Sequence, residues 1–266
     1  MKQQWQITVW GVRGSAPRPA PDCAEYGGNT VCTALEHAGG IVILDAGTGL
    51  ALLGQALAKR QDVRRLDILL SHFHIDHLMG LFLFQPLFCL KTTVRLHGGR
   101  GMARALDTLI GPPFWPLGLR DFPARIEFHE FVPGDSFALD GLTVSTMAGS
   151  HPGGSILYRL DDAENSVTYA LDNETDERTF VALANFARES SLMIWDAAFA
   201  PSKLRPGWGH STWEQGLRLG RAAGVGQVLM THYDWSYTDE FLRLQQRPAD
   251  REPICRFARE GMVIAL

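Results

Sequence analysis

A short apolar segment that runs directly into four metal-binding side chains constrains this chain more than any other feature. Residues 66–70, Leu-Asp-Ile-Leu-Leu, are too short for a helix and predict a buried strand. His72 and His74 follow, and residues two apart in an extended segment point the same way, so both imidazoles can approach one cation from one side. Asp76 and His77 come where the chain can turn into a helix, which brings two more ligands toward a neighbouring point. The fold must therefore place the end of a buried strand beside a metal site.

The chemical types of these four side chains indicate which metal they suit. Imidazole nitrogen and carboxylate oxygen without sulfur favour a borderline ion, so we expect zinc, with manganese and iron as alternatives. A single histidine is usually a core or surface residue, but four potential ligand residues within six positions favour a metal site. The cysteines have no C-x-x-C spacing, so each is expected to be a small core residue rather than a ligand. These cysteines are Cys23, Cys32, Cys89 and Cys255.

Apolar runs rich in branched residues alternate with helix-like patterns along the chain, which predicts a mixed α/β fold. The expected strands are residues 7–10, 30–35, 41–44, 66–70, 94–97, 125–128, 142–147, 156–160, 167–171, 193–195 and 228–231. The expected helices are residues 50–59, 102–110, 180–189, 212–223 and 238–246. Neither a low-complexity linker nor a short-period repeat interrupts this order, so we expect one domain over residues 1–266.

Length, charge and hydropathy exclude several classes of function. The chain has 266 residues, of which 45% are hydrophobic, and this is enough for one sizeable core. Its formal net charge of -4 excludes a global basic field of the kind that draws nucleic acid through its phosphates. No segment reaches the roughly 18 apolar residues that could span a bilayer. We therefore expect a soluble, cytoplasmic protein without a membrane partner.

The segment 72–77, His-Phe-His-Ile-Asp-His, resembles the His-x-His-x-Asp-His signature of the metallo-β-lactamase superfamily. Residues 44–49, Leu-Asp-Ala-Gly-Thr-Gly, resemble the Asp-x-Gly-x-Gly block that precedes this signature, and blocks around His151, Asp172 and His232 follow in the family's order. The resemblance spans nearly the whole chain. It implies a four-layer αβ/βα sandwich, in which two sheets pack face to face, helices cover the outside and the ligands lie on loops at one edge.

The resemblance also implies a centre of two divalent ions. The first ion would be bound by His72, His74 and His151, the second by Asp76, His77 and His232, with Asp172 as the bridge. Two cations roughly 3.5–4 Å apart can share a water, lower its pKa to give a hydroxide at neutral pH, and stabilise charge on the attacking and leaving oxygens. Asp45 is expected to support the ligand loop from behind. The remaining histidines that match no block, and that we expect to be structural, are His37, His97 and His129.

Two later segments resemble the ribonuclease Z and cyclic phosphodiesterase branch of this family. Residues 207–212, Gly-Trp-Gly-His-Ser-Thr, resemble its His-Ser-Thr block, and residues 194–199 resemble its His-Glu-Ala-Thr-Phe stretch with Trp195 and Asp196 in place of His and Glu. An ester oxygen of a phosphodiester is a poor leaving group and benefits from a general acid. We therefore expect His210 to donate a proton and Asp196 to orient it. The alternative is that Gly-His-Ser-Thr is only a helix cap with a surface histidine.

The N-terminal segments 10–17 and 26–30 resemble the same branch. Ser15 and Asn29 are expected near the mouth of the site, while Arg13 could either meet a phosphate or form a structural salt bridge. Asn173 and Tyr233 depart from the branch pattern, so the polarity of the pocket should differ from that of relatives.

The substrate class has to come from features outside the metal signature, because the family hydrolyses many kinds of bond. Ribonuclease Z carries a long basic arm between its third histidine and bridging aspartate, whereas here about twenty residues separate His151 from Asp172, and Asp161, Asp162 and Glu164 make them acidic. Transfer RNA is therefore a poor candidate. We expect a small-molecule substrate, such as a cyclic nucleotide or cyclic sugar phosphate, and the chain could also form a homodimer.

Two other functions are compatible with the signature. A lactonase, thioesterase or β-lactamase could use the same metals, but it would not need an acid such as His210, because a metal can stabilise its leaving group. A non-catalytic binding or sensing module is a third hypothesis. The complete ligand set argues against it. The catalytic set expected for the phosphodiesterase consists of His210, Asp196 and the metal-binding Asp76.

Overall fold

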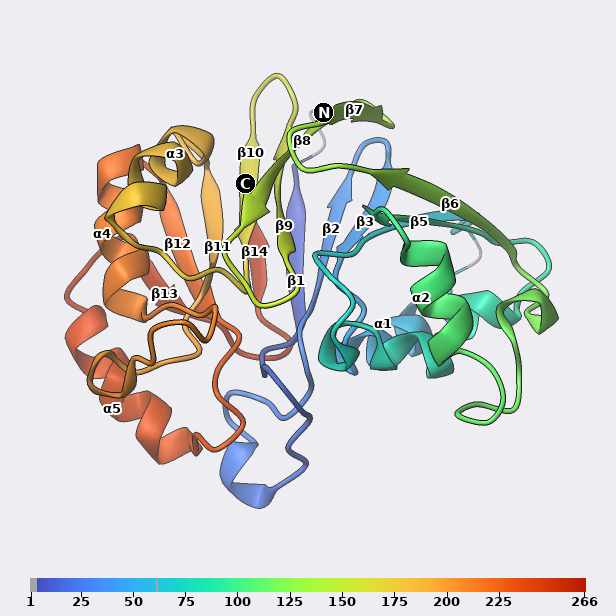
Figure 1. Cartoon of the computed structure of the whole chain (residues 1–266), viewed down its shortest axis with the longest axis horizontal. Helices are drawn as coiled ribbons and strands as arrows, with labels where there is room; N and C mark the ends of the chain where they lie inside the picture. Colours follow the sequence, from blue (N-terminus) through green and yellow to red (C-terminus); the bar gives the residue numbers. More distant parts are fainter. Residues whose placement is uncertain (1–3, 61) are drawn as a thin grey trace.

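Two seven-stranded β-sheets face each other and carry helices on their outer sides (Figure 1). The computed structural model describes residues 4–60 and 62–266. In order across the first sheet, the strands are β14 (Val263–Ala265), β1 (Gln6–Gly11), β2 (Cys32–His37), β3 (Gly40–Leu44), β4 (Arg65–Leu69), β5 (Thr93–Gly99) and β6 (Arg125–Phe131). In order across the second, they are β13 (Cys255–Phe257), β12 (Gln227–Thr231), β11 (Leu192–Asp196), β10 (Ser166–Ala170), β9 (Ser155–Asp161), β8 (Leu142–Gly149) and β7 (Ser136–Leu139).

Both sheets combine antiparallel and parallel pairing in the same way. In the first sheet the pairs from β14 to β3 are antiparallel and those from β3 to β6 are parallel. In the second sheet the pairs from β7 to β10 are antiparallel and those from β10 to β13 are parallel. Parallel strands place their carboxyl ends at one edge, and ligands bind at that edge in open α/β sheets. The loops that follow β3, β4, β10, β11 and β12 therefore open at the same edge of the sandwich.

Among the described residues, five α-helices form the two outer layers. They are α1 (Gly49–Ala58) and α2 (Met102–Leu109) beside the first sheet, and α3 (Glu177–Phe186), α4 (Trp213–Ala223) and α5 (Asp239–Ala249) beside the second (Figure 1). Leu53 of α1 and Leu106 of α2 are buried in one cluster with Ile43 of β3 and Ile68 of β4. A second cluster holds the inner faces of both sheets and the buried faces of α3 to α5. This confirms the four-layer αβ/βα fold class expected from the sequence.

The expected elements form with small shifts of their ends, but some details differ. All the expected helices are present, and Thr212 caps α4 by accepting a hydrogen bond from the Gln215 backbone N–H, as predicted. The sequence did not predict β7, β13 or β14, because each has only three or four residues at or near a sheet edge and carries too little alternation to recognise. Cys89 is exposed, contrary to the expectation that each cysteine would be a core residue.

Three further observations concern the segment after the first ligands, the described residues and the length of the helices. The segment after the first ligands turns into a 3-10 helix, Ile75–His77, and not into an α-helix. The expected domain over residues 1–266 includes residues 1–3 and 61, which lie outside the described residues. Within the described part of the chain, no helix combines the length and the apolar character that crossing a membrane requires.

Candidate metal centre

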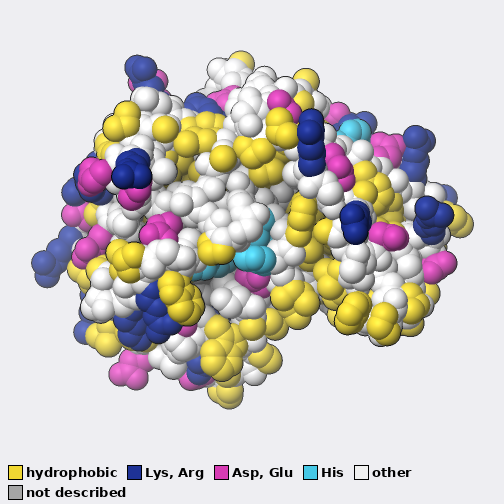
Figure 2. Space-filling model, viewed as in Figure 1, with side chains coloured by type: hydrophobic (Ala, Val, Ile, Leu, Met, Phe, Trp, Pro, Cys, Tyr) yellow, Lys and Arg dark blue, Asp and Glu magenta, His cyan; other side chains and the backbone are white. Residues whose placement is uncertain are grey.

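The predicted ligands come together at the carboxyl ends of the strands. His72 follows β4, Asp172 follows β10 and His232 follows β12 directly. Asp172 (φ 50°) and His232 (φ 61°) adopt left-handed backbone conformations, as does Asp45 (φ 59°) after β3. Such conformations are uncommon for residues other than glycine and concentrate at functional sites. They turn each side chain sharply away from its strand toward a shared point, and Figure 2 shows histidine side chains reaching the surface near the centre of this face.

His72, His74 and His151 form the first group of potential ligands. Their ring centroids are 4.4 Å (His72 to His74), 4.9 Å (His72 to His151) and 5.0 Å (His74 to His151) apart. One ligand nitrogen from each lies within 4.8 Å of the others. His72 is buried and its Nε2 has no hydrogen-bond partner, whereas His74 is exposed. An unpaired buried nitrogen in such a group is what a bound cation would satisfy.

Asp76, His77 and His232 form the second group, and all three side chains are buried. His77 Nε2 lies 3.3 Å from Asp76 Oδ2 and 3.4 Å from His232 Nε2. Asp172 lies between the groups: its Oδ1 is 3.9 Å from His72 Nε2, and its Oδ2 is 3.1 Å from His232 Nε2. One carboxylate oxygen thus faces each group, which is the geometry that a bridging ligand needs.

The outer nitrogens of two of these imidazoles are held by groups behind the cluster. His77 Nδ1 is 2.8 Å from Asp45 Oδ2, and Asp45 also accepts hydrogen bonds from Ser71 and from the Tyr169 hydroxyl. His151 Nδ1 donates to the backbone carbonyl of Gly209 at 2.9 Å. Metal-binding histidines usually have such an acceptor, which fixes the ring and the tautomer. Asp45 therefore occupies the supporting position that the sequence predicted for it.

Four carboxylates in this region, those of Asp45, Asp76, Asp172 and Asp196, are at most 6% exposed. Every ion pair they make within residues 4–60 and 62–266 is with a histidine, and none is with lysine or arginine. Burying several carboxylates is costly without a compensating positive charge. Divalent cations would supply that charge, so the residues present fit a metal centre.

The pKa shifts of His77 and His72 agree with a metal centre at this position. Burial disfavours the charged form of His77, but the carboxylates of Asp172, Asp45 and Asp76 outweigh burial and raise its pKa well above the usual range. Burial and the neighbouring His77 lower the pKa of His72 well below its usual range. A negative field around one imidazole, beside a second imidazole that stays neutral, is a suitable environment for cation binding.

His210 lies beside the two ligand groups and is held by a buried carboxylate. Its Nδ1 is 2.8 Å from Asp196 Oδ2, and Asp196 is fully buried at the end of β11. Burial opposes protonation of His210, but Asp196 outweighs burial and raises the pKa of His210 to about 9. The hydrogen bond to Asp196 leaves Nε2 as the nitrogen open to a substrate. The arrangement differs from a surface histidine at a helix cap, which was the alternative left open by the sequence.

Five of the seven proposed ligands and His210 line one cleft of ≈ 210 Å³. Its lining residues are Ser15, His74, Asp76, His151, Pro152, Asp172, Trp208, His210 and His232. His74 and the neighbouring His72 also border an adjoining recess of ≈ 380 Å³, whose other lining residues are mostly small. The sequence assigned no role to Trp208, although the Gly-Trp-Gly sequence places an aromatic residue two positions before His210.

Several residues expected near the mouth have other contacts. Arg13 is buried and donates to the backbone carbonyls of Gly27 and Tyr237, and it makes no salt bridge with the described residues. Its side chain does not line the cleft. Asn29 bonds to Glu260 and does not line the cleft. Ser15 does line it, and its backbone N–H donates to Asp76 Oδ2 at 2.7 Å.

The two departures from the branch pattern are buried. Asn173 accepts a hydrogen bond from the Ser150 N–H through its Oδ1, next to the His151 loop. The Tyr233 hydroxyl donates to the backbone carbonyls of Met230 and Ala258. Neither side chain lines the cleft, so both act on the site only through the backbone around it.

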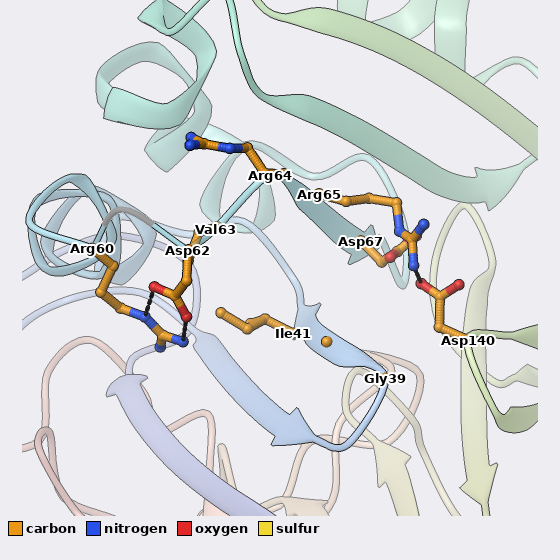
Figure 3. Close-up of a pocket in the computed structure, with 10 residues that line it drawn as sticks. Gly39, Ile41, Arg60, Asp62, Val63, Arg64, Arg65, Asp67 and Asp140 are labelled. Atoms are coloured by element: carbon orange, nitrogen blue, oxygen red, sulfur yellow. Dashed lines mark hydrogen bonds and ion pairs between the residues drawn. The ribbon is translucent and has the colours of Figure 1, made fainter.

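A second cavity, of ≈ 280 Å³, lies at the other end of β4, where Arg65 begins the strand (Figure 3). Both of the arginine–aspartate pairs in its wall are close: Arg60 Nη2 is 3.1 Å from Asp62, and Arg65 is 2.6 Å from Asp140. Figure 3 shows the Arg60 guanidinium facing Asp62 across two contacts. These carboxylates have arginine partners, whereas the carboxylates of the histidine-lined cleft pair with histidines among the described residues.

Comparisons with known proteins agree with this geometry. A family model described as a beta-lactamase superfamily domain matches residues 41–233. An uncharacterised protein of Mycobacterium tuberculosis is 28% identical over 240 residues, which cover 85% of this chain and 80% of that protein. Ribonuclease Z of Thermoplasma acidophilum is 25% identical over 228 residues, covering 67% of this chain and 72% of its own. The metallo-β-lactamase fold protein YhfI from Bacillus subtilis matches with a TM-score of 0.76 and 19% identity, covering 100% of both chains.

Proposed function

This chain belongs to the metallo-β-lactamase superfamily, and from that premise we propose that it is a dinuclear metal-dependent hydrolase of small phosphodiesters, cyclic ones included. The observation that carries the proposal is the His210–Asp196 pair, with 2.8 Å between Nδ1 and Oδ2, in the wall of the ligand-lined cleft. A phosphodiester has a poorly departing alkoxide, and a held imidazole beside the metals is suited to protonating it. An acyl hydrolase has less need for such a residue.

In this proposal the two groups of side chains hold two divalent ions, with zinc the favoured metal and manganese or iron as alternatives. His72, His74 and His151 would hold one ion, Asp76, His77 and His232 would hold the other, and Asp172, with one oxygen facing each group, would contribute to both sites. Bound ions would activate a water and neutralise charge on the phosphate. Asp45 holds the ring of His77 in the orientation that this requires.

His210 supplies the proton that the leaving oxygen requires. Its elevated pKa, about 9, keeps it protonated near neutral pH, and Asp196 holds Nδ1 so that Nε2 can donate. Cations bound at the neighbouring ligands would oppose this rise.

The substrate is proposed to be small because of what connects His151 to Asp172. The connection is the β9–β10 hairpin, in which Asp161 ends β9 and Asp162 follows in the turn, in place of a basic arm. Such a hairpin offers no positive surface for a transfer RNA backbone.

The experiment begins with metal analysis of the purified protein. It is followed by a screen of bis-(p-nitrophenyl) phosphate, cyclic nucleotides, nitrocefin, lactones and thioesters, before and after chelation and with zinc or manganese restored. We expect about two ions per chain and metal-dependent hydrolysis of phosphodiesters. Turnover of a lactone or thioester without any phosphodiester would overturn the substrate class and leave the metal centre standing. A fully loaded protein with a single ion would overturn the dinuclear centre.

A further inference from the structure

Trp208 is a large apolar side chain exposed at the metal cleft. It is 57% exposed and lines the cleft together with His210 and Asp172. Exposing an aromatic ring of this size forgoes the stabilisation that its burial would give, and exposed aromatic rings are common where a ligand binds. The position of Trp208, two residues before the proposed proton donor, places it on the side of the cleft where the leaving group would depart.

The turn that carries Trp208 is clamped by one carboxylate. Glu174 accepts hydrogen bonds from the backbone N–H groups of Gly207, at 2.8 Å, and Gly209, at 3.0 Å, which flank Trp208 on both sides. The Glu174 N–H in turn donates to the Ser150 carbonyl at 2.8 Å, next to His151. One residue therefore ties the Trp208 turn to the loop that carries a proposed metal ligand.

One glycine of this turn, Gly209, has no room for a side chain. Gly209 has a φ of +77°, and a Cβ built there would lie 2.4 Å from His151 Nδ1. The Arg205 guanidinium also lies over the Trp208 ring, 4.8 Å from its centroid. Trp208 is thus held by its backbone and on one ring face while much of the ring stays exposed, so it would lose little conformational freedom when a ligand packs against it.

We propose that Trp208 is a substrate-binding wall that stacks on a flat ring in the leaving group. This inference rests on the proposed phosphodiesterase function and narrows its substrates to phosphodiesters whose leaving alcohol carries an aryl or heterocyclic ring. Glu174 is a positioning residue for this wall. Stacking of a ring on an aromatic side chain tolerates many ring types, so the wall selects for flatness rather than for one chemical identity.

The kinetic test compares two phosphodiesters whose leaving alcohols have similar acidity but different shape. Methyl phenyl phosphate has a flat leaving group, and methyl hexafluoroisopropyl phosphate has a branched one. In metal-loaded enzyme, Trp208→Ala should lower kcat/KM for the phenyl ester by roughly 10-fold and change kcat/KM for the fluoroalkyl ester little. Trp208→Phe should retain most of the preference, because it keeps a flat ring.

The chain offers a matched control in Trp235. This tryptophan is 48% exposed and has the Arg18 guanidinium 5.5 Å from its ring centroid, but it does not line the cleft. Trp235→Ala should leave kcat/KM for both esters unchanged. Glu174→Ala should reduce the kcat/KM preference for the phenyl ester, but by less than Trp208→Ala does. Glu174→Gln, which keeps one carbonyl acceptor, should restore part of this preference.

A binding measurement gives a readout that does not depend on turnover. Zinc-loaded protein should bind phenyl methylphosphonate more tightly than ethyl methylphosphonate by calorimetry, and Trp208→Ala should remove the difference while metal content stays the same. Equal losses on both esters, in a protein that hydrolyses them, would overturn the role of Trp208 alone. A metal-loaded wild-type protein that hydrolyses no phosphodiester would overturn the proposed function and this inference with it.

Discussion

Polar side chains connect the two sheets at two places, and these places differ in the side chains that pair with their buried carboxylates. The first, the edge cluster, consists of Asp67, Arg95, His97 and Asp140. Arg95 Nη2 lies 2.6 Å from Asp67 and 2.5 Å from Asp140, and His97 Nε2 is 2.8 Å from Asp67. The second, the ligand cluster, is the set of proposed metal ligands with Asp45 and Asp196. Its carboxylates pair only with histidines among the described residues, whereas each carboxylate of the edge cluster has an arginine.

The charges of the edge cluster have a structural role, whereas those of the ligand cluster are suited to a bound cation. A buried ion pair with its own counter-charge joins two elements, and breaking it leaves an unpaired charge that costs stability. The burial of carboxylates without a lysine or arginine partner is better explained by a bound metal cation, because perturbed and unpaired groups concentrate at functional sites. Substitutions in the ligand cluster should therefore change metal content and turnover, while substitutions in the edge cluster should change stability.

The largest expected effect is that of Asp76→Ala. It removes one ligand of the second group, so metal content should fall from two ions to about one per chain and turnover should fall to background. The fold should persist, because the ligands lie on edge loops outside the apolar core. Elemental analysis, circular dichroism and a turnover assay check these outcomes together. Some loss of thermal stability is expected, since bound metal stabilises the native state, but an unfolded Asp76→Ala protein would contradict the separation of the two clusters.

The next effect in size is that of His210→Ala, which should lower turnover of an unactivated phosphodiester by roughly 10²–10⁴-fold. Metal content should not change, because His210 is proposed as an acid and not as a ligand. For a substrate with a p-nitrophenolate leaving group, which departs without protonation, the loss should be much smaller, and Asp196→Asn should show the same pattern in milder form. Equal losses for both kinds of substrate would mean that His210 supports the metals or positions the substrate.

Arg95→Ala should show the opposite behaviour. It leaves Asp67 buried without its arginine, and we expect a loss of about 2–3 kcal/mol in the free energy of unfolding, less than for a fully buried pair because the Arg95 side chain is 18% exposed. Metal content and kcat of the folded fraction should stay at wild-type values. Denaturant unfolding and metal analysis test this, and a loss of bound metal in Arg95→Ala would show that the two clusters are coupled.

The smallest expected effect concerns His37, which lies outside both clusters. Burial lowers the pKa of His37 below the usual 6.5, and the carboxylates around it only partly offset this. Below about pH 6.5 the unfolded chain therefore binds the proton more readily than the folded one, and stability falls as pH falls. His37→Gln should make the decline from about pH 7 to about pH 5 shallower. Both proteins are compared at the same metal loading, so that the ligand histidines contribute equally to the pH dependence of stability. Identical slopes of the free energy of unfolding against pH would exclude His37 as a source of acid sensitivity.

Local patterns in the sequence were enough to predict most of the elements and the ligand types. Each expected helix has its own apolar periodicity, and the run from His72 to His77 carries four ligand side chains in one short segment. The segment containing His210 was recognised instead by its resemblance to a block of a known family. The short strands β7 and β14 were not, because three or four residues carry no clear period and their pairing depends on the neighbouring strand.

The sequence by itself thus predicted the helices and the ligands from His72 to His77, because these depend on residue types at short and fixed spacings. The fold class and the distant ligands His151, Asp172 and His232 followed from the resemblance to a known family. Only the tertiary structure decided what lies between distant segments. It placed Arg13 against the backbone carbonyls of Gly27 and of the distant Tyr237. It also turned one oxygen of Asp172 toward each group, and placed Glu174 against Gly207 and Gly209. No spacing in the sequence encodes such contacts. The partners of a buried polar group are the backbone and side-chain groups that the packed sheets bring within hydrogen-bond distance.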